Sequence, residues 1–425
     1  MSTNKTTRQK VAAGLPRRRR REFMFKMLGM VATAVGVLFL GVFFASLIAE
    51  GSSAFKQTYL KLDVELREDV IAPGGELDLA YADFDGLVRT ALRKEVPEVS
   101  GRSDRRQLYR IVSVGAAYQV RDLVAANPEL LGTTQTLWVP TSSNIDMLIK
   151  GNIDPSLEEA LRPVSDKQIA WVESLHKAGR IESRFNSALF SNGDSREPEL
   201  AGIKGAVMGS MYMLLVTMML SFPIGVAAAI YLEEFAPRNR WSDLIEVNIN
   251  NLAAVPSIVF GLLGLAVFIN WAGLPRSAPL VGGLVLTLLT LPVIIIASRA
   301  AIKAVPPSIR EAALGLGASQ TQVVFHHVLP LAMPGMLTGA IIGMSRALGE
   351  SAPLLMIGMV AFIVDVPGSL TDPATALPVQ IYLWADSPER AFAERTSAAI
   401  IVLLGFLLVM NLTAVIMRKR MERKW

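Results

Sequence analysis

The chain has 425 residues, of which 52% are hydrophobic and 19% are charged, and its mean hydropathy is +0.40. This composition is too apolar for a soluble protein of this length and indicates an integral membrane protein. The formal net charge of +5 is concentrated at the two ends of the chain and beside apolar segments, which argues against a nucleic-acid-binding surface.

The first predicted element is a transmembrane anchor over residues 27–49. These 23 residues carry no charge, and about 20 apolar residues suffice to cross the hydrocarbon core. They follow a basic segment, residues 1–26, which holds nine Lys or Arg and one acid. A secretory signal peptide also begins with basic residues, but its apolar region is shorter, about 7–15 residues. We therefore expect an uncleaved anchor helix.

Residues 50–200 differ in character from the rest of the chain. They carry 18 Lys or Arg and 24 Asp or Glu, and they contain no apolar run of membrane length. We expect a soluble α+β domain, in which Ser165 caps the last helix and Gly179 ends it. No nucleophile paired with a base is apparent in this segment. Its expected elements are strands over 60–67 and 135–139 and helices over 104–126 and 166–178.

Residues 201–417 are almost continuously apolar and predict five further transmembrane helices. Together with the anchor they make six spans, so both ends of the chain lie on the same side of the membrane. The basic residues 1–26 and the basic tail 418–425 place that side in the cytoplasm, and the 50–200 domain on the outer side. The five expected spans are 205–232, 252–271, 278–297, 337–364 and 397–417.

The polar gap before the fifth of the six spans holds a patterned segment over residues 306–330. Two alanines after Glu311 favour a short helix, Gly317 permits a turn with positive φ, and Ser319 can cap a second helix. Pro330 is expected to end that second helix. An amphipathic helix pair on the membrane surface and a docking element for another protein both fit this pattern.

Several kinds of chemistry are excluded by the residues present. The sequence contains no Gly–Lys pair and hence no G-x-x-x-x-G-K-[ST] phosphate loop. It has no cysteine, and none of its histidines has metal-ligand spacing to a carboxylate. We therefore expect no cofactor, no metal and no catalysis of covalent chemistry, and expect any ATP to be hydrolysed by another polypeptide.

Arg346 and Glu350 are ionisable residues inside the expected span 337–364, about 10–14 residues from its start. Their i, i+4 spacing places them on one helix face near the middle of the bilayer. Charge at that depth is costly and suggests a functional site. Together with Ser351 they are candidate substrate-pathway residues that contact or gate an anion. A mutual ion pair that only holds helices together is the alternative.

Four motifs resemble those of binding-protein-dependent ABC importer permeases. The 306–330 segment resembles the EAA loop of that family, although His327 stands where the family pattern has an aliphatic residue. RALGESAPLL at 346–355, ALPVQIY at 376–382 and AVPSIVFG at 254–261 resemble the phosphate importers of the family. The resemblance covers residues 200–417. The matching EAA-loop positions are Glu311, Ala312, Ala313, Gly317, Leu329 and Pro330.

The resemblance implies an α-helical polytopic permease of the bacterial inner membrane, with the ABC importer permease fold and an extracytoplasmic α+β insert. It implies a subunit of an inorganic phosphate importer whose EAA residues enter a cleft on an ATPase. The implied partners are a second permease subunit (PstC), an ATPase dimer (PstB), a periplasmic phosphate-binding protein (PstS) and membrane lipid, but no nucleic acid.

Two alternatives to phosphate import remain open. One is a permease for another oxyanion, such as sulfate or molybdate, because substrate choice belongs partly to the binding protein. The other is a membrane-anchored sensor whose 50–200 domain binds a ligand. A sensor would require a cytoplasmic signalling domain, and the sequence shows none.

Overall fold

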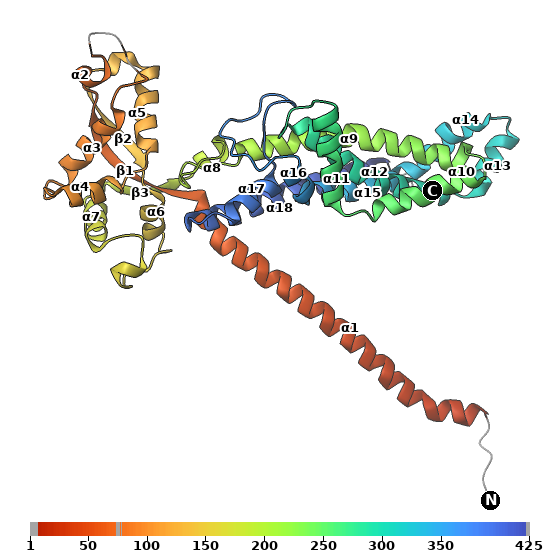
Figure 1. Cartoon of the computed structure of the whole chain (residues 1–425). Coiled ribbons are helices and arrows are strands. Elements are labelled where there is room, and N and C mark those ends of the chain that lie inside the picture. The colour runs from red at the N-terminus through yellow and green to blue at the C-terminus, as the bar shows by residue number, and fades with distance from the viewer. Residues whose placement is uncertain (1–6, 74–76, 78, 422–425) are drawn as a thin grey trace, which may run out of the picture.

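The computed structural model describes residues 7–73, 77 and 79–421. An elongated bundle of helices lies beside a small α+β domain, and the first helix projects away from both (Figure 1). Residues 1–6 of the basic N-terminal segment and 422–425 of the basic tail lie outside the described residues.

Helix α1 (Thr7–Ser52) extends the expected anchor at both ends. Its side chains from residue 15 to residue 46 are exposed, and Leu47 is the first that is buried. Near its end, Gly51 lies against the backbone of Ser397 and Ala398 in α18 (Ala391–Met421). A helix that is apolar all round and uncovered by its own chain is typical of a membrane span.

The α+β domain is built on a three-stranded antiparallel sheet in the order β2-β1-β3. The central strand β1 (Lys56–Glu65) pairs with β2 (Thr134–Pro140) and β3 (Ile181–Phe185). Alternate residues of β1 face the core, where Leu60 and Leu62 are completely buried. Both strands that the sequence predicts are confirmed, whereas the short, exposed β3 was not predicted.

Helices surround this sheet, and one prediction about them is wrong. The helix expected over 104–126 is divided into α4 and α5, because the backbone between them turns aside to pair Val112 with Thr141 next to β2. The predicted cap of α7 is confirmed, since Ser165 accepts the backbone N–H of Gln168. The helices are α2 (Glu68–Ile71), α3 (Phe84–Glu95), α4 (Arg102–Tyr109), α5 (Gly115–Ala126), α6 (Ser143–Ile149), α7 (Asp166–Lys177) and α8 (Ala188–Ser191).

The bundle is organised around α12 (Pro279–Lys303), which packs between α9 (Lys204–Ile230) and α15 (Leu329–Gly349). The described residues include five helices that are long and apolar enough to cross a membrane, or six if one bent pair counts as a single span. The second member of that pair occupies the expected span 252–271.

The structure shows a sharp bend near the start of this expected span. Helix α10 (Arg240–Ala253) meets α11 (Ser257–Gly264) and its π-helical continuation to Trp271 at 101°. The cause is Pro256, which lacks a backbone N–H and disfavours helical backbone at Val255.

The expected span 337–364 is also not a single helix. Helix α15 ends at Gly349, and the extended backbone of Glu350 separates it from α16 (Ala352–Met356). At its other end, the helix runs without a break from Gln320 through a π-helical segment (Val323–Val328) into α15. Pro330 therefore lies inside a helix instead of ending one. Helix α17 (Leu377–Ala385) follows α16.

Buried ion pairs join the α+β domain to the start of α18. Lys150 Nζ lies 2.7 Å from Glu394 of α18 and 2.7 Å from Asp146 of α6, and all three side chains are at most 9% exposed. The adjacent Arg395 donates a 3.1 Å hydrogen bond to Gln57 of β1. Removing Lys150 from such a group would take away the cation in direct contact with both carboxylates and leave only the nearby Arg395 to oppose them.

We expect Lys150→Met to lower the stability of the full chain by about 3–5 kcal/mol, because two buried carboxylates lose their cation. Thermal unfolding in detergent measures this loss. The control is Lys167→Met, which breaks the exposed ion pair with Asp104 and should change little. Equal melting temperatures for the two variants would contradict the importance of the buried group.

Candidate functional site

The 306–330 segment forms the helix, glycine turn and second helix that its residues predict. Helix α13 (Pro307–Gly315) ends before Gly317, whose φ of +87° reverses the chain. Ser319 then accepts the backbone N–H of Gln322, the last residue of α14 (Gln320–Gln322), and the Gln322 side chain returns a bond in a capping box. Both local features follow from the residue types alone.

The EAA-loop residues divide into exposed and buried positions. Glu311 and Ala312 are exposed, whereas Ala313 is only 6% exposed and packs into a cluster that joins the loop to the bundle. Leu329 and Pro330 are half-buried at the start of α15. The buried members of the cluster are Ala229, Ile230, Ile302, Val305, Ala313, Val323, Val324, Val328, Ala332 and Met336.

The same loop exposes large apolar side chains at the end of the bundle where α13 and α14 lie (Figure 1). Leu316 is 90% exposed, and Leu314 and Phe325 are also exposed. His327, which departs from the family pattern, is exposed, while the adjacent Val328 is buried in the cluster. A group of exposed apolar residues on a well-anchored loop is typical of a protein-binding surface.

The sequence analysis missed two arginines that form ion pairs at this end of the bundle, and one of them, Arg310, holds the loop against the end of α9. Arg310 Nη2 lies 2.7 Å from Glu234 in the π-helical end of α9 (Tyr231–Phe235) and donates to the carbonyl oxygen of Ile302. Arg299 of α12, which is 8% exposed, pairs with the neighbouring Glu233 and with Glu246 of α10. The sequence signal for these ion pairs was Glu233 and Glu234, two adjacent acids that directly follow the apolar run over 205–232.

Arg346 and Glu350 are brought together, but not in the setting expected. Arg346 Nε lies 3.4 Å from Glu350 Oε1, with the two side chains 44% and 19% exposed. Arg346 occupies the last turn of α15, Glu350 follows the helix end, and Ser351 is half-buried before α16. The pair thus sits at a helix break and not inside a continuous helix. A cation is stabilised at this position by the helix dipole.

The three motifs resembling phosphate importers pack together, although they are far apart in the sequence. A Cβ at Gly261 of α11 would lie 2.7 Å from Pro353 Cα of α16, so glycine is needed for the close approach. Leu377, at the start of α17, donates its N–H to Ser210 Oγ of α9. Phe260, Leu354 and Val379 belong to one buried cluster. Helix α16, directly after the break at Glu350, is therefore packed against α11.

No group of three His, Asp or Glu side chains that could hold a metal ion occurs within residues 7–73, 77 and 79–421. The residues of this site are instead a cation beside a carboxylate and a loop that offers apolar contacts. These features can bind an anion and a protein, respectively.

Comparison with known proteins gives two family matches. Residues 221–425 match the family described as binding-protein-dependent transport system inner membrane component. Residues 12–159 match a domain of unknown function, DUF3333.

Among individual proteins, the chain is 39% identical over 155 residues to the probable ABC transporter permease protein YqgI of Bacillus subtilis (strain 168). That match covers 36% of this chain and about half, 52%, of YqgI. The chain is 32% identical over 217 residues to phosphate transport system permease protein PstA 1 of Mycobacterium tuberculosis (strain CDC 1551 / Oshkosh), covering 51% of this chain and 70% of that protein.

Among solved structures, one of the MetNI methionine ABC transporter in inward-facing conformations aligns with a TM-score of 0.43 and 20% identity. The alignment covers 51% of this chain and 95% of that one. The sequence matches to PstA 1 and to the inner membrane component family are the ones that identify the chain. The chain therefore belongs to the PstA-like permease family of binding-protein-dependent ABC importers and is a multi-pass inner-membrane protein.

Proposed function

We propose that this chain is a permease subunit of an ATP-driven importer of inorganic phosphate and catalyses no covalent reaction itself. The observation that carries the proposal is the EAA loop, whose exposed residues are anchored at one end of a bundle related to phosphate permeases. The partners would be a second permease (PstC), an ATPase dimer (PstB) and a periplasmic phosphate-binding protein (PstS).

In this proposal the loop transmits movement of the ATPase into the membrane. Glu311, Ala312 and the exposed side chain of Leu316 would enter the ATPase cleft, while Ala313 stays fixed in its cluster. The Arg310–Glu234 pair ties the loop to α9. ATP binding would bring paired loops together and rotate the helices as rigid bodies, which opens the outer side.

The Arg346–Glu350 pair would act in the substrate pathway. A guanidinium keeps its charge and offers a planar fork of donors suited to phosphate oxygens. Its 3.4 Å contact with Glu350 is long, and Arg346 is 44% exposed, so an arriving anion could replace the carboxylate as counter-ion. The break between α15 and α16 places irregular backbone, with Ser351, beside the pair.

The proposed topology follows from the basic flanks of the spans. Residues 1–26 and the tail 418–425 would be cytoplasmic, the 27–49 segment would cross the membrane, and the 50–200 domain would lie in the periplasm. The permease domain over 201–417 would then present its EAA loop, 306–330, to the cytoplasmic ATPase.

We expect Gly317→Ala to weaken ATPase association, because a side chain at φ +87° costs about 1–2 kcal/mol of backbone strain. No atom would lie within 4 Å of the added Cβ, so any effect comes from the backbone. The matched control is Gly315→Ala, which is equally uncrowded but lacks positive φ. Copurification of the ATPase and phosphate uptake measure the effect. If ATPase copurification and phosphate uptake are both normal in Gly317→Ala, the loop is not the coupling element.

We expect Arg346→Gln to lower uptake of radiolabelled phosphate at least about tenfold, since it removes the charged donor but keeps a polar side chain. Assembly with the ATPase should be unchanged. Arg346→Lys keeps the charge without the planar fork and should retain partial uptake. Competition by sulfate and molybdate tests the choice of oxyanion in the same assay.

The double variant Arg346→Gln, Glu350→Gln separates transport from a purely structural ion pair. If the pair only held the helix break together, removing both charges would restore uptake. Restored uptake would therefore rule out an anion contact at Arg346.

The absence of cysteine makes the topology directly measurable, because one introduced thiol is the only thiol in the chain. We expect Ser156→Cys, in an exposed turn of the α+β domain, to react with a membrane-impermeant maleimide in intact cells. Arg420→Cys, near the end of α18, should react only after the membrane is permeabilised. The reverse pattern at either position would overturn the proposed orientation.

A further inference from the structure

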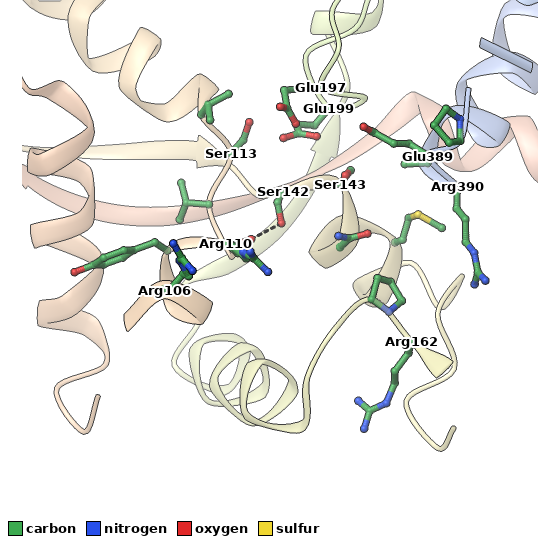
Figure 2. A pocket seen from close by; sticks show the side chains of 18 of the residues that line it. Arg106, Arg110, Ser113, Ser142, Ser143, Arg162, Glu197, Glu199, Glu389 and Arg390 are labelled. Carbon is green, nitrogen blue, oxygen red and sulfur yellow. Dashed lines mark hydrogen bonds between the residues drawn. The ribbon is translucent and has the colours of Figure 1, made fainter. Parts of the chain in front are cut away.

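A cleft with a volume of about 1380 Å³ opens where the α+β domain meets the segment that leads into α18 (Figure 2). Its walls come from α4, from α6 and the residue before it, and from residues 197–199. Residues 388–391 close the opposite side. The cleft is distinct from the EAA loop and from Arg346, neither of which lines it.

Arginine dominates this cleft. Three glutamates, Glu197, Glu199 and Glu389, oppose seven arginines on its walls. Two of the arginines have acidic partners elsewhere, since Arg89 pairs with Asp85 and Arg162 with Asp166. The other five form no ion pair and donate no side-chain hydrogen bond within the part of the chain that the structure describes. They are Arg102, Arg105, Arg106, Arg110 and Arg390.

Four of these five arginines come from α4 and the residue after it. Arg102, Arg106 and Arg110 are spaced four residues apart, so they follow one helix face over about 12 Å at 1.5 Å per residue. Like charges at this spacing destabilise a helix. Folding of α4 gains nothing from the arrangement, whereas an anion lying along that face would contact several guanidinium groups at once.

The cleft also carries polar groups besides the guanidinium groups. Figure 2 shows Arg110 beside Ser142, with Arg390 on the opposite wall. Ser113 and Ser143 add further hydroxyl groups.

The glutamates of the cleft offset this charge only in part. Burial raises the pKa of Glu199, and burial together with the nearby Glu197 raises the pKa of Glu389. Raised pKa values favour the neutral carboxylic acids as the pH falls, so the arginines are opposed least in mildly acidic solution.

The shape and the donors of the cleft indicate the kind of ligand. Guanidinium groups bind phosphoryl oxygens through paired, charge-assisted hydrogen bonds. The volume exceeds the range of about 300–1,000 Å³ for sites that bind drug-sized molecules, so a single phosphate ion would reach only a few of the arginines. The aromatic side chain on the wall, Tyr109, is already covered by Arg89, 5.1 Å from its ring centroid, so the cleft offers guanidinium and hydroxyl groups rather than aromatic surface.

We propose that this arginine-lined cleft binds an oligophosphate, a chain of linked phosphoryl groups, between the α+β domain and the start of α18. Because both sides of the cleft contribute arginines, the bound chain would bridge the domain and the permease. This site does not depend on the proposed phosphate transport.

The experiment is calorimetric titration of the purified full-length chain with tripolyphosphate, orthophosphate and sulfate at equal ionic strength. We expect tripolyphosphate to bind at least about tenfold more tightly than either single anion, because it engages several guanidinium groups together. The variant Arg106→Gln, Arg110→Gln should weaken tripolyphosphate binding at least about tenfold. Both residues are exposed and unpaired, so the fold should tolerate the change, and thermal unfolding checks that it does.

The matched control is Arg121→Gln, Arg184→Gln, which removes two charges from the same domain outside the cleft. It should bind tripolyphosphate like the unaltered chain. Absence of binding, equal affinity for sulfate, or equal loss in the control variant would each overturn the proposal.

Discussion

The close packing of α12 between α9 and α15 is the contact on which both ends of the permease domain depend. A Cβ at Gly283 of α12 would lie 2.5 Å from Val216, and one at Gly339 of α15 would lie 2.3 Å from Ala297. Helices in lipid gain little from apolar burial, so their association relies on small residues that permit such close approach. The EAA loop connects α12 to α15, and Arg346 lies at the far end of α15. One packed unit therefore links the EAA loop to the helix break.

The break between α15 and α16 makes sense in the same terms. Backbone groups freed by a break are tolerated in a membrane only where protein or a water-filled cavity covers them. Glu350 at the break is half-buried, and α16 directly after it meets α11 at the Gly261–Pro353 contact. The arrangement leaves the Arg346 side chain partly exposed. The bend at Pro256 differs, because Pro256 is exposed on this chain.

The α+β domain is oriented by polar contacts and not by an apolar surface alone. Lys150 is shared by Asp146 and Glu394, and Trp384 of α17 donates to Asp194 at 2.9 Å. Buried ion pairs add little net stability, but they tolerate few alternative arrangements. The domain is consequently held where residues 388–391 complete the arginine-lined cleft. The same short segment therefore lines the cleft and leads into α18.

The sequence by itself determined the features that depend on nearby residues. Apolar runs located the membrane helices, alternation located β1, and the turn at Gly317 followed from local chemistry. Contacts between distant residues decided the rest. The helix expected over 104–126 is divided because Val112 pairs with Thr141.

Only the packed structure shows that α15 ends at Gly349 and that the three separated motifs converge. It also shows that Arg110 and Arg390 line the same cleft. The physical reason is the distance along the chain over which each effect acts. Capping, proline geometry and periodicity act within a few residues, whereas the partner of a buried charge or glycine can come from any part of the chain. Only the tertiary structure selects it.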